Sequence, residues 1–447
     1  MKHSVTLDKD KCKGCTTCIK HCPTEAIRVR RGIAHITEER CIDCGNCIRV
    51  CPHKAKKAVC DDFSRLKEFE YNIALPAPSL YGQFRNLTDV NLVLTAFLHI
   101  GFDHVEEVSQ GAELVSSLTK YLMETDPDLP KPLISSACPA AVRLICQRFP
   151  KLIPHISKVS APFEIVAILA RKEAVERTGL PPEKIGVFFI TPCPAKVSAG
   201  RNPAGLTVPV VDGFFAISDI YKKLITAMKA IEKPQKLAHS GLIGVGWAHC
   251  GGESNAVFQG QHLAVDGIDN IIEVLEDLED GQLPQIDFLE LNACNQGCVG
   301  GCLTVENPYV AQTRLKQLIQ HMPISMNKIS TDPVPPAYMF DDKPLEASPV
   351  NVLDEDMEVA MQKFARIEAL VETLPGLDCG SCGAPTCQTL AEDIVQGLAA
   401  EDDCIFRMRE RMQYLMGMGD ADEYLPLPFR RRDEEAEKAE EEERNQS

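Results

Sequence analysis

Short apolar runs recur between residues 70 and 300, separated by longer stretches in which apolar residues return every three or four positions. Runs of five or six residues with a β-type composition are typical of strands buried in a sheet. The predicted strands are residues 71–75, 186–190, 242–246 and 286–291. The intervening stretches predict amphipathic helices, for example over residues 89–99 and 161–178. Strands that alternate with helices indicate an α/β domain with largely parallel sheets.

Residues 1–62 contain an internal repeat of cysteines. Each copy has the spacing Cys-x2-Cys-x2-Cys-x3-Cys followed by proline, and we expect a short helix after each copy, near Thr24 and near His53. In bacterial two-cluster ferredoxins with this spacing, the fourth cysteine of each run ligates the other cluster. The repeat therefore predicts two 4Fe–4S clusters, one on Cys12, Cys15, Cys18 and Cys51 and the other on Cys41, Cys44, Cys47 and Cys22. The alternative is zinc, but zinc sites typically use paired Cys-x2–4-Cys knuckles.

Four further cysteines lie in turns rich in proline or glycine. Cys138 and Cys193 each precede a proline, in Ser-Ser-Ala-Cys-Pro and Thr-Pro-Cys-Pro-Ala-Lys, while Cys294 and Cys298 stand four residues apart before a pair of glycines. These motifs follow strand-like runs, and ligands of open α/β sheets bind outside the carboxyl ends of strands, so we expect the loops to share one crevice. Thiolates that converge from distant segments are what a buried iron–sulfur centre requires.

The C-terminal part of the chain has a different composition. Residues 326–357 are rich in proline and aspartate and predict a linker on the surface. We expect a domain at residues 358–428, with one helix over 358–374 and another over 386–400. Its four cysteines resemble those of a small 4Fe–4S domain, and a zinc site is the alternative. The set consists of Cys379, Cys382, Cys387 and Cys404. Residues 429–447 predict an acidic, disordered tail.

Composition and charge restrict the setting. The 447 residues include 20 cysteines, most of them at metal-ligand spacing, which favours a cytoplasmic metalloprotein over a secreted disulfide protein. The chain opens without an apolar signal segment, and no run of about 18 apolar residues predicts a membrane span. The net charge of −17 argues against nucleic acid as the main partner. The length allows about two to four domains, with the α/β domain expected over residues 63–325.

Taken together, the central motifs resemble those of [FeFe]-hydrogenases over residues 1 to about 320. The resemblance implies a hydrogenase-type α/β domain, with two lobes of parallel-rich sheet around a buried H-cluster, after an N-terminal ferredoxin-type α+β domain. In that family four cysteines bind a 4Fe–4S cluster, and one of them bridges to a two-iron subsite with CO and cyanide ligands. The matching residues here are Cys138, Cys193, Cys294 and Cys298, with Cys298 as the bridge.

The resemblance extends to residues around the implied subsite. Pro78 and Ser79 stand where the family places groups that hydrogen-bond one cyanide, and Lys196 matches the lysine that pairs with the other. An ammonium beside an anionic ligand is favourable in a dry pocket. The alternative for Lys196 is an ordinary surface lysine near a turn. Thr191 and Asn292 replace methionines that usually line the subsite.

The departures from the family concern proton transfer. Catalytic members carry a proton-transferring cysteine at the position of Ala137, and only a serine of their usual route is kept, as Ser157. The carboxylates expected elsewhere fall on residues without an acid: Leu118, Tyr121, Ala199 and Asn255. Proton transfer needs titratable groups at hydrogen-bond spacing, so the familiar relay is expected to be absent. Cys250 and Cys302 are either packed thiols or groups that restore proton transfer or tune the subsite.

Three functions remain open at this point. One is a sensory-type hydrogenase of low activity, which binds H2, exchanges it slowly with protons, and passes its redox state to ferredoxin or another signalling partner. The second is a catalytic hydrogenase that feeds ferredoxin and moves protons through Cys250, Cys302 or water. The third is an iron–sulfur scaffold without the two-iron subsite. The missing relay and the C-terminal cluster domain favour the first, and Ser79 and Lys196 favour the first two over the third.

Overall fold

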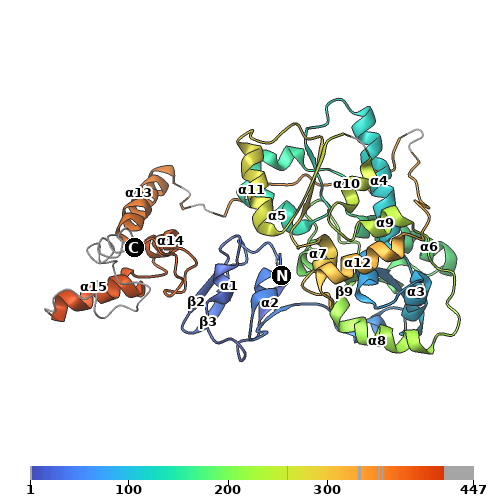
Figure 1. The fold of residues 1–447 in the computed structure, drawn as a ribbon, viewed down its shortest axis with the longest axis horizontal. Helices are drawn as coiled ribbons and strands as arrows, with labels where there is room; N and C mark the ends of the chain where they lie inside the picture. Colours follow the sequence, from blue (N-terminus) through green and yellow to red (C-terminus); the bar gives the residue numbers. More distant parts are fainter. Residues whose placement is uncertain (1–2, 259, 331–333, 351–352, 355, 417–447) are drawn as a thin grey trace, which may run out of the picture. The chain divides into compact units, whose positions relative to one another are not determined.

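The computed structural model describes residues 3–258, 260–330, 334–350, 353–354 and 356–416. The chain divides into two compact units, residues 1–352 and 353–447, which are described separately (Figure 1). This division falls inside the predicted linker. The predicted tail and the end of the predicted C-terminal domain lie outside the described residues. Among the helices that the structure describes, none is both long and apolar enough to cross a membrane.

The N-terminal domain pairs short antiparallel strands around two small helices. Strand β1 (Val5–Leu7) pairs with β4 (Lys56–Ala58), and β2 (Ile27–Arg30) pairs with β3 (Ile33–Ile36). The helices are α1 (Thr17–Lys20) and α2 (Asn46–Val50), so the predicted helices after Thr24 and His53 are wrong. The backbone N–H groups of Ala26 and Ala55 instead donate to the sulfurs of Cys22 and Cys51, at 3.2 and 3.3 Å. The chain therefore wraps around each sulfur before it enters a strand.

Two parallel sheets form the centre of the larger unit, as the sequence predicts. One has the order β6 (His104–Val105), β5 (Tyr71–Pro76), β8 (Ile185–Thr191), β9 (Gly213–Ala216), and the other has the order β10 (His262–Asp266), β11 (Phe288–Asn292), β7 (Leu133–Ile134). Residues Tyr71 and Ile185 are in register in the first sheet, and Phe288 and Leu133 in the second. β8 is buried along its whole length, which explains its uninterrupted apolar sequence.

Helices pack around both sheets, in Figure 1 most visibly α3, α6 and α8 around the first and α5 and α11 around the second. The α-helices of this unit are α3 (Val90–His99), α4 (Val108–Thr125), α5 (Pro139–Arg148), α6 (Pro162–Thr178), α7 (Pro194–Arg201), α8 (Ile217–Ala230), α9 (Leu242–Gly246), α10 (Gly252–Val257), α11 (Ile268–Glu279) and α12 (Pro308–Ile319). The 3-10 helices are η1 (Phe63–Glu68), η2 (Pro78–Gln83), η3 (Pro150–His155), η4 (Pro182–Lys184), η5 (Gly297–Gly300) and η6 (Ala337–Met339).

The two helices named from the sequence are confirmed, whereas one predicted strand is wrong. The Asp89 carboxylate caps α3, and Gly179, with a φ of 69°, ends α6. Residues 242–246 form helix α9 rather than a strand, because a five-residue apolar run does not by itself distinguish the two. A Cβ at Gly244 would collide with the backbone carbonyl of Ser109 in α4, so this glycine permits close contact between α9 and α4.

The predicted linker is partly integrated into the first unit. Ile329 and Met339 are buried in an apolar cluster with Leu118, and Val159 forms a bridge with Phe340. In the second unit, α13 (Met357–Thr373) packs on α14 (Cys387–Val395), followed by η7 (Glu401–Asp403) and α15 (Ile405–Met416). Helix α14 ends earlier than predicted, because the N–H of Leu398 turns back to the Asp393 carbonyl around Gly397, whose φ is 74°.

Candidate metal centre and its pocket

Three loops meet where parallel strands of the two sheets end. The loop after β7 carries Cys138, the loop after β8 carries Cys193, and the segment after β11 carries Cys294 and Cys298. Cys193, Cys294 and Cys298 influence one another's pKa, and Cys138 acts on the latter two, so the four predicted thiols share one site. Burial raises the pKa of Cys294 to about 11. Desolvated thiols that face one another suit a metal, which binds thiolates after their protons leave.

Lys196 lies against these thiols, in the first turn of α7. Its Nζ donates to the Ala137 carbonyl at 3.2 Å and contacts the Cys298 sulfur at 3.6 Å. Burial opposes its charge, but the surrounding thiolates, Cys298 first, raise the pKa of Lys196 above its ordinary value. Lys196 is therefore a half-buried cation at the cluster site and not an ordinary surface lysine.

A pocket of about 50 Å³ opens beside Cys298 and Lys196. Pro78 and Ser79 line it at the start of η2, together with Ala137 after β7. Ser79 is 0% exposed, and its hydroxyl oxygen has no hydrogen-bond partner among the described residues. A buried hydroxyl without a partner is costly, so this wall is suited to a ligand that accepts a hydrogen bond. Asn292 also lines the pocket, whereas Thr191 turns away and donates to the Cys193 carbonyl at 3.0 Å.

Two buried carboxylates that were not singled out from the sequence line the same pocket. Glu253 at the start of α10 accepts a hydrogen bond from the Ser135 hydroxyl at 2.6 Å, and Glu290 on β11 accepts from the backbone N–H groups of Gly251 and Ser254. Burial first and the Glu290 carboxylate second raise the pKa of Glu253 above its ordinary value. A carboxyl group shifted in this way can exchange protons near neutral pH.

The expected positions of the family's relay lie elsewhere. Ser157 is buried outside the pocket lining, and its hydroxyl accepts from the backbone N–H of Val159. Leu118 and Tyr121 belong to an apolar cluster outside the pocket lining. Asn255, on which another expected glutamate falls, is exposed, whereas Glu253 two residues earlier faces the pocket. The Gly251-Gly252 turn preceding an acid was the available signal.

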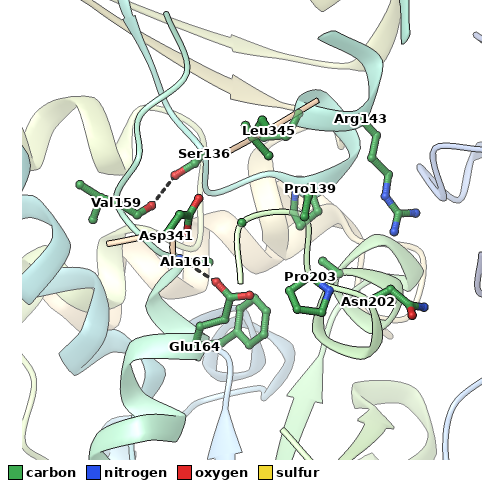
Figure 2. A pocket seen from close by; sticks show the side chains of 15 residues that line it. Ser136, Pro139, Arg143, Val159, Ala161, Glu164, Asn202, Pro203, Asp341 and Leu345 are labelled. Carbon is green, nitrogen blue, oxygen red and sulfur yellow. Dashed lines mark hydrogen bonds between the residues drawn. The ribbon is translucent and has the colours of Figure 1, made fainter. Parts of the chain in front are cut away.

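A second cavity, of about 70 Å³, lies next to the first (Figure 2). Ala161 and Phe163 line both, and Ala199 lines only the second. Figure 2 shows Glu164 accepting from the Ala161 N–H, with Asp341 nearby. Burial raises the pKa of Glu164 to about 7 and that of Asp341 to about 6. The position where the family's glutamate is missing thus borders a cavity with acids from other segments.

Cys250 and Cys302, which are not among the predicted ligands, lie on different sides of the centre. Burial, Glu290 and Asp266 raise the pKa of Cys250 to about 12, while a hydrogen bond with Asn292 opposes that shift. Cys302 packs on Gly45 of the N-terminal domain, where a Cβ would collide with its sulfur, and lies within electrostatic reach of Cys294. Cys250 is therefore near the carboxylates, and Cys302 is at the junction between two cysteine sites.

The N-terminal cysteines gather as the cross-ligation pattern requires. Four of them line one pocket: Cys12, Cys15, Cys18 and Cys51. Cys22 instead acts electrostatically on the thiols of the second run, Cys41, Cys44 and Cys47. The second group faces the central site, because Ile42 and Cys44 pack against Ala195 and Ala293 of the larger domain.

Asp43, in the second cysteine run of the N-terminal domain, forms an ion pair and hydrogen bonds with residues near the central site. Its carboxylate, with a side chain that is 0% exposed, accepts from the backbone N–H groups of Ser4 and Val5 and from the Arg143 guanidinium at 2.8 Å. It also accepts from the Ser198 hydroxyl. Arg143 and Ser198 belong to α5 and α7, the helices that begin directly after Cys138 and Cys193. One carboxylate thus joins the N-terminal domain to both helices.

In the second unit, all four predicted ligands line one pocket, which is formed by the loop after α13, the first turn of α14 and the start of α15: Cys379, Cys382, Cys387 and Cys404. The Asp378 carboxylate accepts from the Cys387 N–H, and Ala384, Leu390 and Cys404 are buried in the apolar core of this unit. The four thiols therefore share one site.

Comparisons with known proteins agree with this architecture. The family model for the iron only hydrogenase large subunit, C-terminal domain, matches residues 70–262 and 226–302, which together span slightly more than half of the chain. A 4Fe–4S dicluster model matches residues 4–52, and an Fe–S cluster family model matches residues 374–406.

Among curated proteins, the chain is 25% identical over 194 residues to the NADP-reducing hydrogenase subunit HndD of Solidesulfovibrio fructosivorans, covering 41% of this chain and 30% of that protein. It is 28% identical over 104 residues to the cytosolic Fe-S cluster assembly factor NAR1 of Yarrowia lipolytica, covering 23% and 21%. The matched stretches thus span less than a third of these relatives. Apo [FeFe]-hydrogenase HydA1 from Chlamydomonas reinhardtii superposes with a TM-score of 0.48 at 16% identity, covering 64% of this chain and 99% of that one.

Proposed function

The chain belongs to the iron-only hydrogenase large-subunit family, and we propose that it binds H2 and interconverts it slowly with protons and electrons as a hydrogen or redox sensor. In this proposal Cys138, Cys193, Cys294 and Cys298 would hold a 4Fe–4S cluster, and the adjoining pocket beside Cys298 would hold a two-iron subsite. When bound, that group supplies the site at which hydrogen is bound and split. We also propose a cytoplasmic location, where thiolate ligands stay reduced.

The observation that carries this proposal is the pair of polar groups in the pocket lining shared with Cys298. Lys196 is a half-buried ammonium that contacts the Cys298 sulfur, and Ser79 is a buried hydroxyl without a hydrogen-bond partner among the described residues. A cluster alone would compensate Lys196 but would leave Ser79 unsatisfied. Anionic ligands that accept hydrogen bonds, such as cyanide, would satisfy both residues. The residues present therefore fit the two-iron subsite.

Proton exchange at this pocket is assigned to the carboxylate side. Glu253 holds a proton more readily than an exposed glutamate and can pass it to or from the Ser135 hydroxyl, 2.6 Å away. Glu290 raises the proton affinity of Glu253 by its charge while its own oxygens accept three hydrogen bonds. Ala137 cannot carry a proton, so no side chain at that position continues a relay. A detour through carboxylates is consistent with slow turnover, and a bound state that persists suits a sensor.

Electrons are assigned to the N-terminal domain and the C-terminal unit. The two N-terminal 4Fe–4S clusters would connect the central site to ferredoxin or another redox or signalling partner. The Cys302–Gly45 contact and the Asp43 interactions keep the second N-terminal site close to the central one. A fourth 4Fe–4S cluster is proposed on Cys379, Cys382, Cys387 and Cys404.

Iron–sulfur assembly without the two-iron subsite is the second candidate function, because several of the matched relatives are named as NAR1 assembly factors. That function would use the four central thiols but has no need of a half-buried cation and an unpartnered hydroxyl in the same pocket lining. A catalytic, ferredoxin-linked hydrogenase is the third; it would require fast proton exchange through the carboxylates or Cys250.

Infrared spectroscopy and an iron count after maturation separate these functions. The proposal expects CO and cyanide bands and about eighteen iron atoms per chain, from four 4Fe–4S clusters and two further irons. About sixteen irons without such bands would replace the proposal with the assembly function. If the bands are present and hydrogen evolution equals that of ordinary catalytic hydrogenases, the sensor role is wrong and the catalytic function stands.

A further inference from the structure

Strand β4 carries two neighbouring lysines with opposite environments. Lys57 points outward, and its Nζ lies 2.8 Å from an Asp8 carboxylate oxygen. Lys56 points inward: it is 3% exposed, and its Nζ has no hydrogen-bond partner among the described residues. The alternation of a β-strand explains the two directions but not why an ammonium occupies the inward position.

The surroundings of the Lys56 ammonium are thiols from both N-terminal sites. The ammonium is close enough for its charge to act on the thiols of both Cys18 and Cys47. Cys18 belongs to the first cysteine site and Cys47 to the second. Lys56 also lines the pocket of the first site. The ammonium therefore lies between the two sites and acts on both.

An ammonium buried without a counter-charge is strongly unfavourable, and buried lysines are normally paired. No carboxylate pairs with Lys56 in the described part of the chain. A 4Fe–4S cluster with four thiolates is an anion and becomes one unit more negative on reduction. Two such clusters would supply the counter-charge that the protein itself does not.

We propose that Lys56 is a shared electrostatic counter-ion of the two N-terminal clusters and raises the reduction potential of both. The positive charge stabilises the reduced form of each cluster more than the oxidised form, because the reduced form is more negative. It also offsets the repulsion between electrons on neighbouring clusters. The inference rests on the proposed N-terminal cluster ligation, but it does not depend on the two-iron subsite.

Arg49 illustrates the contrast at the next junction. Its guanidinium donates to the Gly300 carbonyl at 2.5 Å and favours the thiolate of Cys294, but the residue is exposed. Water and a backbone carbonyl already satisfy this cation, so its charge needs no cluster to compensate it. Lys56 has neither of these partners.

The test is an EPR-monitored redox titration of the full chain with its 4Fe–4S clusters, prepared without the two-iron subsite. In Lys56→Met, both N-terminal midpoint potentials are expected to fall by an amount equal to at least a tenfold change in one-electron equilibrium, about 59 mV. Lys56→Arg keeps the charge and should stay closer to the parent. Lys57→Met removes the exposed neighbour and serves as the matched control, with potentials unchanged.

Unchanged potentials in Lys56→Met with intact clusters would overturn the inference. If Lys56→Met loses the N-terminal clusters, their retention in Lys56→Arg supports a charge role, whereas their loss in both variants leaves only a packing role and also overturns it. An iron count on the parent is made first, because missing N-terminal clusters there would contradict the proposed ligation rather than the role of Lys56.

Discussion

The two sides of the pocket beside Cys298 differ sharply in chemistry. Ala137 offers the pocket only a methyl group, and Leu118 and Tyr121, where the family places carboxylates, belong to an apolar cluster outside the pocket lining. Elsewhere in the lining, Glu253 and Glu290 are two buried carboxylates, and Glu253 accepts a hydrogen bond from the Ser135 hydroxyl. The two sides meet at the loop after β7, which supplies both Ser135 and Ala137.

This difference shows that a missing relay, position by position, does not mean a pocket without titratable groups. The resemblance predicts acids at Leu118 and Tyr121, but the side chains at these two positions pack in an apolar cluster. The structure provides other acids on α10 and β11, which approach the same pocket from a different direction. The rate of proton exchange then depends on how well the second side works, and this can be measured.

The largest expected effect comes from removing the titratable group on the carboxylate side. Glu253→Gln keeps an oxygen that can accept from Ser135 but cannot exchange a proton. Hydrogen evolution should fall about 10²–10⁴-fold, the usual contribution of general acid–base participation. The infrared bands of the bound subsite should remain, because Glu253 is not a ligand of it.

Glu273→Gln, an exposed change on α11, is the matched control and should leave the rate unchanged. A rate for Glu253→Gln within twofold of the parent would assign proton exchange to water or to Cys250 instead.

The next prediction concerns Glu164, an acid that lines the second cavity, and asks whether it affects the stability of the fold or the rate of turnover. In the folded protein the pKa of Glu164 is raised from 4.5 to about 7, chiefly by burial. Because the folded state then binds the proton more tightly than the unfolded state, stability is lost as pH rises from about 4.5 through about 7. Glu164→Gln removes this pH-dependent loss of unfolding free energy, which reaches about 3 kcal/mol above pH 7.

Thermal unfolding at pH 4.5 and pH 8 checks this expectation: the variant should gain relative to the parent on going to the higher pH, while hydrogen evolution stays the same. Glu176→Gln, exposed on the same helix, should show no pH-dependent gain. A large loss of turnover in Glu164→Gln would instead place this cavity in the proton route.

The smallest effect is expected on the apolar side. Ala137→Cys restores a thiol next to Cys298, but the buried Leu118 and the packed Tyr121 offer no acid beyond it. We expect hydrogen evolution to rise by less than about tenfold, which is below the usual 10²–10⁴-fold contribution of an acid–base group because the onward path of the proton is missing. A rise of several hundredfold would show that Ala137 alone limits the rate.

The parts of the molecule that could be predicted from the sequence are those with strong local signals. Cysteine spacing and buried apolar runs identify the ferredoxin-like domain, the parallel sheets and the loops that bring Cys138, Cys193, Cys294 and Cys298 together. The strand predicted at residues 242–246 is wrong, because this segment forms a helix packed on α4 and no local sequence pattern reveals that contact.

The polar groups of the site were harder to find. Glu253 and Glu290 are single acids in otherwise ordinary segments, and their importance follows from burial and mutual proximity. Lys56 could not be distinguished from Lys57 by sequence, since only the direction of β4 separates them. Long-range placement, rather than residue type, creates these features.

The Asp43 interactions have a consequence for modularity. A ferredoxin-like domain is commonly regarded as a cassette that can be moved between enzymes, but here its cluster loop carries an acid whose partners Arg143 and Ser198 belong to the body of the larger domain. Cutting the chain after residue 62 would strip Asp43 of those partners and uncover Ile42, which is 1% exposed in the intact protein. A transplant of this domain would succeed only with a host surface that offers a matching cation, hydroxyl and apolar patch.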